Sequence, residues 1–573
     1  MIRIPNKNKQ FSVDNASFSR GNIYSTWNVM FDADIGKIKL NPPLQKLLST
    51  TDDAAFKVPF SVLVAQKNGG GALDAYILAY LHGTFKGVWS TYANSLTRLT
   101  GTDAPSTVTD TTSDMCFFNG AITVSDSVGL HYVDDDASAG GWTKNTNAAF
   151  QGKFILIPYA DRLYLFNSST VVSCDTAYTP ATSGSYTIAT GLANITCARA
   201  SSKRIWFASS GENDLPESKI YEWDGVQVSP LNTFIINTPD IQTIVILNDI
   251  PVAIDGRGNF WFYDGYQFVL KTGINIPARE DDFNTTCKIH RNGAITLKGK
   301  IYALVASRSD ALPNTSERAL AGIWCYDPMI GLYHFSSPDN CSRIEFPYAL
   351  AKGTNDQRFI AGYQSGTGSI TDFNSRIAVT ETDAGLSGEI RTGFITTQFM
   401  ESQNLTDMWN SVGIKYRKMI DPDAKIEVKY RFNKNIEANG GITWTGATTF
   451  TVDSTSINGA GTFCTPVVVG DEVMVQEGTN AGLIAHITTI VVAGVTTTIT
   501  IDRSATTTSG TAYAMFSNFT LLGTITNDGD TYKNFRLAKK STMIQVKLVM
   551  TWKGYYDEVQ EILLSEQKQD STI

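Results

Sequence analysis

Charged residues are scarce in this sequence, and those present form no basic cluster. Asp, Glu, Lys and Arg make up 18% of the 573 residues and give a formal net charge of −8, whereas soluble proteins average roughly 25% charged residues. Binding to nucleic-acid phosphates requires clustered Lys and Arg. The composition therefore argues against sequence-specific nucleic-acid binding, although it is compatible with a mildly acidic wall past which DNA slides without sticking.

Cysteine and histidine are also sparse, and neither forms a ligand pattern. The five histidines show no HExxH spacing, and the seven cysteines show no CxxC spacing. Dispersed cysteines in a long chain indicate core residues made in a reducing compartment, not a disulfide framework or a zinc site. They are Cys116, Cys174, Cys197, Cys287, Cys325, Cys341 and Cys464. We expect no metal and no cofactor.

Long hydrophobic runs are absent as well. The first residues, Met1 to Lys7, lack the apolar run of a secretory signal. No stretch approaches the length of about 18 apolar residues that a membrane-spanning helix needs. We therefore expect a protein without a membrane anchor, which is made in the cytosol and stays there or leaves inside an assembly.

Helical periodicity is nearly absent, and a recurring aromatic phrase takes its place. In each copy an aromatic-rich strand runs into a tight turn, at Asp224, Asp264 and Asp327, which are 40 and 63 residues apart; residues 163–168 form a weaker copy. Such repeats with variable loops indicate a β-propeller, whose four-stranded blades take about 40–50 residues each. Repetition at this spacing favours core packing of the aromatic side chains, including that of Trp261, over ligand stacking.

The alternation of strands and turns runs from residue 56 to residue 400, which we assign to the propeller. Six blades are predicted at residues 56–105, 112–150, 152–192, 194–236, 240–282 and 284–346. Residues 347–400 supply a seventh blade or close the ring. Residues 1–55 form a lead segment, which is part of the first blade or a docking arm.

The pattern changes after residue 400. Residues 401–435 and 518–573 contain strands in which apolar and polar residues alternate, as in half-exposed antiparallel sheets. Residues 436–517 are richer in Thr, Val, Ala and Gly and are bounded by turns, where insertions are tolerated. The predicted fold is all-β: a six- or seven-bladed β-propeller followed by an antiparallel β-sandwich with an inserted small β-module.

Catalytic motifs occur only as near misses. The run from Gly293 to Lys300 differs from a phosphate loop in its spacing and has Ile301 where Ser or Thr would bind magnesium, so we predict a hairpin. Gly362 to Gly366 is not a nucleophile elbow, and Ser125 to Gly129 departs from the sialidase turn. Asp134 to Asp136 lack the glycine-centred loop of a calcium site. We assign no catalytic, cofactor-binding or metal-binding residue and expect no enzyme.

Besides the aromatic phrases, three segments match the pattern of a known protein family: Asn28 to Pro43, Gly388 to Thr397, and Val412 to Arg417. With them the chain resembles the propeller-bearing tail proteins of tailed bacteriophages, especially the nozzle or hub proteins of short-tailed phages. The resemblance is architectural and spans most of the chain, apart from residues 436–517.

The resemblance implies a structural virion protein in the tail. Such a protein forms a homo-oligomeric ring, commonly sixfold, around the DNA channel and takes part in DNA ejection. Its partners would be other copies of itself, tail proteins above and below, and tail fibres or spikes, while DNA passes without sequence-specific binding. It would be synthesised in the host cytoplasm.

Two other functions remain open at this point. The first is a receptor-binding or glycan-binding tail protein, whose propeller loops contact host polysaccharide. The second is a propeller glycoside hydrolase or sialidase, which needs a pair of carboxylates on facing loops. Saturable binding to host cells would select the former, and release of reducing sugar would select the latter.

Overall fold

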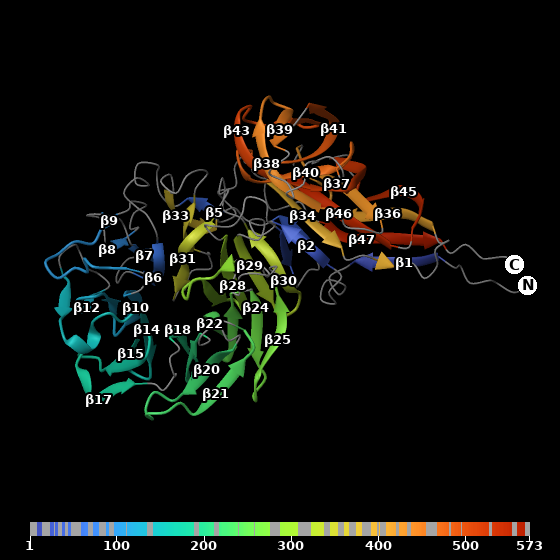
Figure 1. Ribbon diagram of the computed structural model, residues 1–573. Coiled ribbons are helices and arrows are strands. Elements are labelled where there is room, and N and C mark those ends of the chain that lie inside the picture. Colours follow the sequence, from blue (N-terminus) through green and yellow to red (C-terminus); the bar gives the residue numbers. More distant parts are fainter. Residues whose placement is uncertain are drawn as a thin grey trace, which may run out of the picture.

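The computed structural model describes the following residues of the chain: 8–13, 23–27, 29–32, 37–40, 44–46, 59–66, 73–79, 87–90, 97–109, 112–134, 141–187, 194–210, 217–238, 240–256, 258–274, 287–307, 322–336, 344–352, 360–365, 374–380, 391–397, 400–401, 408–419, 423–432, 437–453, 467–480, 483–493, 496–526, 530–541, 543–552 and 559–567. Their regular structure is β-strand apart from one 3-10 turn, Ala148–Phe150. No helix in these ranges is long and apolar enough to span a membrane. The predicted all-β fold is confirmed: a propeller, a sandwich and a barrel (Figure 1).

Seven blades of antiparallel strands form the propeller. Within each blade the strands follow one another along the chain from the innermost to the outermost, except that the outermost strand of blade 7 comes from the N-terminal segment. Blade 1 is β6 (Pro59–Gln66), β7 (Leu73–Ala79), β8 (Gly87–Ser90) and β9 (Thr97–Arg98). Blade 2 is β10 (Asp114–Phe118), β11 (Ala121–Ser125), β12 (Leu130–Asp134) and β13 (Thr143–Asn145). Blade 3 is β14 (Ile155–Tyr159), β15 (Arg162–Phe166), β16 (Thr170–Cys174) and β17 (Pro180–Thr187). Blade 4 is β18 (Ile195–Ala200), β19 (Ile205–Ser209), β20 (Ser218–Trp223) and β21 (Asn232–Ile236).

The remaining blades follow the same order. Blade 5 is β22 (Ile241–Leu247), β23 (Ile250–Asp255), β24 (Asn259–Tyr263) and β25 (Phe268–Gly273). Blade 6 is β27 (Ala294–Leu297), β28 (Lys300–Ser307), β29 (Gly322–Asp327) and β30 (Gly331–Ser336), with β26 (Cys287–Lys288) also paired to β28. Blade 7 is β31 (Ile344–Lys352), β32 (Ile360–Ser365), β33 (Asn374–Thr380) and the N-terminal strand β5 (Leu44–Lys46).

Two pairings close the ring of blades. The innermost strands of blades 7 and 1 run parallel, with Ala351 opposite Val62 on β31 and β6. Strand β5 supplies the outermost strand of blade 7, where Lys46 pairs with Ala378. The N-terminal segment therefore completes the last blade, whereas the sequence pattern assigns it to the first blade or to a docking arm.

The aromatic phrases lie on the third strands of blades 4, 5 and 6, where the strand enters its last turn. The weaker copy lies instead on β15, the second strand of blade 3. Its Asn167 uses the same turn chemistry, because the side-chain oxygen accepts the N–H groups of Ser169 (3.2 Å) and Thr170 (2.8 Å). Core packing holds for Trp223, which is buried, but Trp261 is only half-buried.

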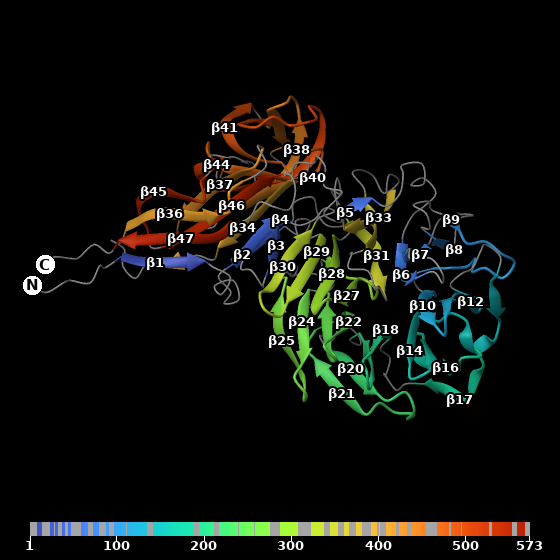
Figure 2. The same cartoon turned by 180° about the vertical axis from the view of Figure 1, so that it is seen from behind.

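Two six-stranded sheets form the sandwich beside the propeller (Figures 1 and 2). One contains β1 (Asn8–Val13), β3 (Val29–Asp32), β4 (Lys37–Leu40), β36 (Met408–Tyr416), β45 (Tyr532–Lys540) and β47 (Val559–Gln567). The other contains β2 (Ile23–Trp27), β34 (Arg391–Thr397), β35 (Met400–Glu401), β37 (Lys425–Phe432), β44 (Thr520–Thr526) and β46 (Met543–Trp552).

The sandwich is therefore larger than the sequence-based division, which gave it residues 401–435 and 518–573. Strands β1 to β4 come from the predicted lead segment 1–55, and β34 comes from the predicted propeller range 56–400. Strand β34 belongs to the sandwich because it pairs along its length with β46, for example Phe394 with Val549.

The inserted module is a closed six-stranded barrel. Its strands, in the order in which they pair, are β38 (Glu437–Trp444), β39 (Thr449–Asp453), β42 (Thr496–Ile501), β41 (Ile484–Ala493), β40 (Glu472–Gly478) and β43 (Gly510–Ser517). These strands lie within the range 436–517 assigned to the module. The barrel has its own apolar core, which includes Phe450, Ile499 and Phe516.

Candidate functional site

The near misses of the sequence are turns or strands wherever the structure describes them; residues 362–365, for example, lie in strand β32. Leu297 pairs with Lys300 across the β27–β28 turn, so that segment is the predicted hairpin. Asp126 is buried between β11 and β12, where it accepts the N–H groups of Val128 (2.8 Å) and Gly129 (3.1 Å). Within the described ranges, no three His, Cys, Asp or Glu side chains are placed to hold a metal ion. Residues 135–136 of the acidic run lie outside the described residues.

Polar side chains instead meet on the propeller axis, near the ends at which the innermost strands begin. Asp114, the first residue of β10, is buried. Its carboxylate accepts hydrogen bonds from Ser61 Oγ on β6 (3.1 Å), Asn292 Nδ2 before β27 (3.1 Å) and the Leu156 N–H on β14 (3.0 Å). One carboxylate thus ties together blades 1, 2, 3 and 6.

Two arginines extend this network across the channel. Arg291 Nη2 donates to the Ser113 carbonyl on the opposite side (3.0 Å). The Arg291 carbonyl accepts hydrogen bonds from Arg199 Nη2 on β18 (3.0 Å) and from Thr243 Oγ1 on β22 (2.8 Å). We call these residues the axial hub: Ser61, Asp114, Arg199, Thr243, Arg291 and Asn292. Together with Leu156 they link six consecutive blades and span the channel at this end.

Beyond the hub the channel widens into a cavity of about 540 Å³. Most of its lining residues lie one to three positions further along the same innermost strands, among them Leu63, Phe117 and Ile246. Pro158 on β14 and Thr296 on β27 also line it. Its wall is mainly apolar, and Arg199 is the charged side chain among the described residues that line it.

Exposed apolar side chains recur at one position of three successive blades. The turn between the third and fourth strands carries Val226 in blade 4, Tyr266 in blade 5 and Met329 in blade 6, which are 72%, 89% and 70% exposed. Each follows the turn aspartate by two residues, and its N–H donates to that carboxylate at 2.8–2.9 Å. Ile235 and Leu270 on the outer strands are exposed as well. We call these five residues the rim surface.

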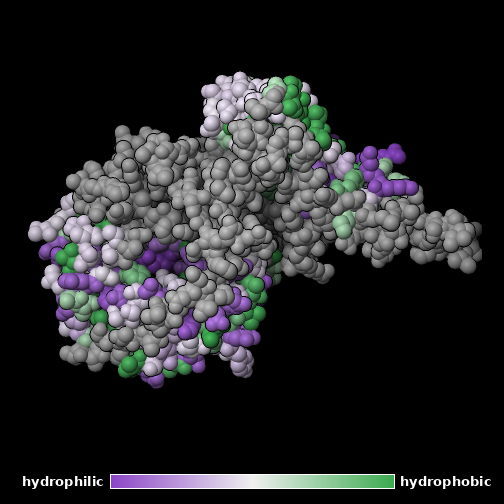
Figure 3. All heavy atoms as spheres, in the orientation of Figure 1, coloured by the Kyte–Doolittle hydropathy of each residue, from purple (hydrophilic) through white to green (hydrophobic). Residues whose placement is uncertain are grey.

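A second exposed apolar surface lies on the barrel. Val468 and Val469 precede β40, while Val491 and Val492 lie near the end of β41, and all four are more than half exposed. We call them the barrel surface. Figure 3 shows hydrophobic atoms at the edge of the propeller and on the flank of the barrel near β41. The chain therefore has two exposed apolar surfaces in two different domains.

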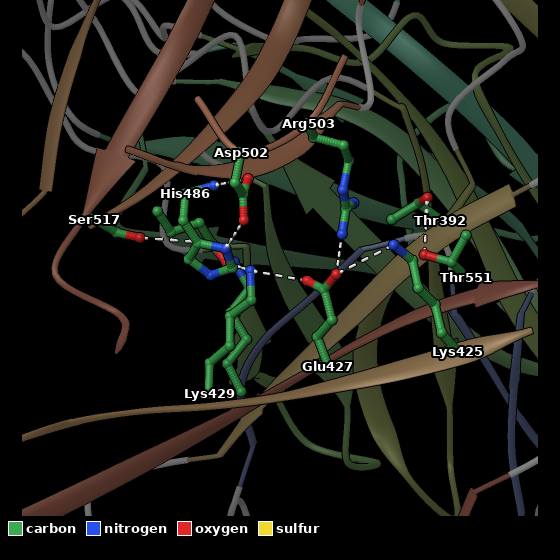
Figure 4. Close-up of polar contacts among 11 residues, drawn as sticks. Thr392, Lys425, Glu427, Lys429, His486, Asp502, Arg503, Ser517 and Thr551 are labelled. Atoms are coloured by element: carbon green, nitrogen blue, oxygen red, sulfur yellow. Dashed lines mark hydrogen bonds and ion pairs between the residues drawn. The ribbon is translucent and has the colours of Figure 1, made fainter. Parts of the chain in front are cut away.

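Buried charges hold the barrel on the sandwich (Figure 4). Glu472, the first residue of β40, is fully buried and accepts hydrogen bonds from Lys429 Nζ on β37 and Lys547 Nζ on β46. Glu427 on β37 pairs with Arg503, which follows β42 in the barrel. We call these five residues the ionic junction. Each of its two carboxylates is bound by a basic group from the other domain.

The ionic junction corrects one expectation from the sequence. Strand β37 alternates apolar and polar residues, a pattern that predicts a polar face in contact with solvent. Ile426 and Val428 do pack in the sandwich core, but Glu427, Lys429 and Arg431 on the other face are also buried. They are buried because the barrel covers that face. Alternation identifies the two faces of a strand without revealing what covers the polar one.

The junction shifts the pKa of its acidic and basic groups. Burial alone would raise the pKa of Glu472, but attraction to Lys429 and Lys547 outweighs it and lowers the pKa to about 2. Burial lowers the pKa of the neighbouring Lys425 to about 8, and repulsion from Arg503 adds to the shift. Glu472 is therefore ionised at neutral pH, and removing it would take away the carboxylate shared by two buried lysines, of which Lys429 also lies 3.4 Å from Glu427 Oε2.

Comparison with known proteins finds matches among solved structures but none by sequence. No family model matches the sequence. No curated protein matches it either. Among solved structures, the WD40 domain of Neurospora crassa Pan2 shares 9% identity, covering 62% of this chain and 98% of that one, with a TM-score of 0.38. The WD40 β-propeller domain of Doa1 shares 11% identity, covering 61% and 100%, with a TM-score of 0.38.

A longer match is the extracellular domain of the putative one component system BT4673 from B. thetaiotaomicron. It shares 11% identity and covers 79% of this chain and 50% of that one, with a TM-score of 0.38. The propeller assignment itself comes from the strand pairing described above.

Proposed function

We propose that this protein is a structural component of a bacteriophage tail and assembles into a ring around the DNA channel. The observation that carries the proposal is the presence of two separate exposed apolar surfaces, the rim surface and the barrel surface. A closed ring uses heterologous contacts, in which two different patches of the chain meet around the axis. Exposed apolar patches commonly mark protein interfaces. The order of propeller and then sandwich agrees with the tail proteins that the sequence resembles.

The axial hub bears on the path of DNA in such a ring. Side chains from opposite blades hydrogen-bond across the propeller axis, as Arg291 does to the Ser113 carbonyl at 3.0 Å, which leaves no room for a duplex. DNA would instead pass along the axis of the ring, between subunits. A net charge of −8 supports passage without sequence-specific binding.

The ionic junction supports a mechanical role for the barrel. Ion pairs between two domains are directional, so they hold the barrel in one orientation relative to the sandwich. A force applied by a neighbouring subunit at the barrel surface would therefore be transmitted to the sandwich, because the barrel does not move freely on a flexible linker. A ring that transmits force between its subunits requires this property.

The test is the mass of the purified protein by light scattering, together with electron microscopy of the particle that carries it. We expect a closed ring of copies around an axial channel. A monomer or trimer on the periphery of the particle would favour receptor or glycan binding, and release of reducing sugar from polysaccharide would favour a hydrolase.

Variants of the two apolar surfaces sharpen this test. Tyr266→Asp and Val491→Asp are each expected to shift the mass from the ring to the single chain, because burying an unpaired carboxylate in an interface is costly. Ser509→Asp, at an exposed turn of the same barrel, adds the same charge outside both surfaces and should leave the mass unchanged. A ring that survives both surface variants would show that assembly uses other residues.

A further inference from the structure

We propose that the cavity at the mouth of the propeller channel binds a small organic anion, with its charged group on Arg199 and its apolar body against the cavity wall. This site goes beyond the tail function proposed above and does not depend on it. Ligand sites are typically cavities of about 300–1,000 Å³, lined mainly by apolar side chains with a few polar groups. The channel cavity, at about 540 Å³, has that size and that lining.

Arg199 supplies the charged contact. Its Nη1 donates to the Ala198 carbonyl (3.2 Å) and its Nη2 to the Arg291 carbonyl (3.0 Å), whereas a guanidinium has five N–H donors. Within the part of the chain that the structure describes, both of these partners are neutral carbonyls. Arg199 is half-buried, so an anion that reaches its remaining donors would gain charge-assisted hydrogen bonds.

The charge of the axial hub favours an anion over other ligands. Arg199 and Arg291 bring two positive charges to this end of the cavity, and Asp114 is the hub carboxylate that attracts Arg199. That carboxylate also accepts hydrogen bonds from Ser61 and Asn292. A ligand with a negative charge would be attracted to these guanidinium groups, whereas a cationic ligand would meet repulsion from them.

The walls specify the rest of the ligand. Leu63, Ile157 and Ile246 line the interior. Phe117 also lines the cavity and is 40% exposed. A flat or branched hydrocarbon body would cover this ring and release water from it. The chemical class that fits is therefore a carboxylate or sulfonate with an apolar body.

The test uses the purified full-length protein and the dye 8-anilinonaphthalene-1-sulfonate, which joins one sulfonate to an apolar ring system. N-phenyl-1-naphthylamine has the same rings without the sulfonate and serves as the neutral probe. In fluorescence titrations we expect Arg199→Gln to raise the Kd for the anionic dye about tenfold or more, because the substitution removes charge-assisted hydrogen bonds. Arg199→Lys should restore part of the affinity. The neutral probe should bind both proteins equally.

A second pair of variants decides the question even if Arg199→Gln does not fold. Thr296 lines the cavity and is exposed, so Thr296→Asp places a negative charge at the mouth without disturbing the core. We expect Thr296→Asp to weaken binding of the anionic dye and the matched Thr296→Asn to leave it unchanged. Arg204→Gln, on an arginine paired with Glu222 outside the cavity, is the control for loss of a positive charge.

Two results would overturn the proposal. The first is an unchanged Kd of the anionic dye in Thr296→Asp, together with an unchanged Kd in Arg199→Gln wherever that variant folds. This would place the dye elsewhere, for example on the rim surface. The second is an equal loss of affinity for the neutral probe, which would show that the cavity takes apolar molecules without recognising their charge.

Discussion

The sandwich is joined to the propeller and to the barrel by opposite kinds of chemistry. Toward the propeller the contact is apolar: Ile323 and Phe335 of blade 6 belong to the same contiguous core cluster as Val412 and Ile426 of the two sandwich sheets. Toward the barrel the contact is ionic and centres on Glu472. Among the described residues, a small apolar cluster accompanies it, which contains Phe394, Met474, Ile484 and Val549.

The difference lies in what each junction specifies. Apolar packing is non-directional and roughly proportional to the area removed from water, so the propeller junction chiefly adds stability. A buried ion pair adds little net stability, because desolvation offsets the attraction, but breaking it is strongly destabilising. The barrel junction therefore chiefly selects one orientation of an inserted domain. The two junctions should accordingly respond differently to substitution.

The largest effect is expected at the ionic junction. Glu472→Ala would remove the carboxylate that accepts hydrogen bonds from both Lys429 and Lys547, leaving Lys429 with Glu427 alone in the junction, at a cost of about 3–5 kcal/mol in the free energy of unfolding. Urea denaturation of the variant and the wild type measures this difference. A change below about 1 kcal/mol would mean that water reaches the lysines and that the junction is not closed.

Deletion of the whole barrel distinguishes the cost of leaving the lysines buried, as in Glu472→Ala, from the cost of losing the barrel domain itself. Replacing residues 437–517 by a short Gly-Ser bridge returns Lys429 and Lys547 to water, so we expect the remaining protein to stay folded and to be less destabilised than Glu472→Ala.

The acid dependence of stability gives a second check of the ionic junction. Because folding lowers the pKa of Glu472 from its ordinary 4.5 to about 2, its contribution is complete above pH 4.5 and is lost as the pH falls toward 2. Glu472→Gln should lack that part of the acid dependence.

The apolar junction should respond by a smaller amount that depends on the cavity created. Ile323 is fully buried in the cluster shared by blade 6 and the sandwich, and Ile323→Ala should lower the free energy of unfolding by about 2–4 kcal/mol. Val226→Ala, on an exposed residue of the rim surface, removes two methyl groups outside any core and should change it by less than about 0.5 kcal/mol. Equal effects of the two substitutions would contradict the assignment of Ile323 to the shared core.

Local features of the fold could be predicted from the sequence, whereas the contacts that join distant segments could not. The aspartate turns were predictable because Asp224 and Asp264 bond to N–H groups only two and three residues away. Strand β5 was not, since three residues carry too little pattern to reveal a partner on β33. The axial hub was equally hidden, because Arg291 and Ser113 are 178 positions apart and neither lies in a motif.

The smallest effect is expected at Trp261, because burial of the aromatic phrases depends on the position within the repeat. Trp223 is buried against Tyr164 and Phe166 of blade 3, so Trp223→Ala should cost about 3–5 kcal/mol. Trp261 is half-buried, and its Nε1 donates to Asp255 Oδ2 at 3.0 Å. Because part of its ring already meets water, Trp261→Ala should cost only about 1–2 kcal/mol.

Trp261→Phe keeps most of the ring but removes the N–H donor, so it separates packing from the hydrogen bond to Asp255. We expect it to retain more than half of the stability that Trp261→Ala loses, as measured by urea denaturation. If Trp261→Ala instead costs as much as Trp223→Ala, then something covers the exposed part of its ring. In the assembled protein that cover would be a neighbouring subunit, and the excess cost would disappear under conditions that dissociate the ring, because binding stabilises the folded chain only while the partner is present.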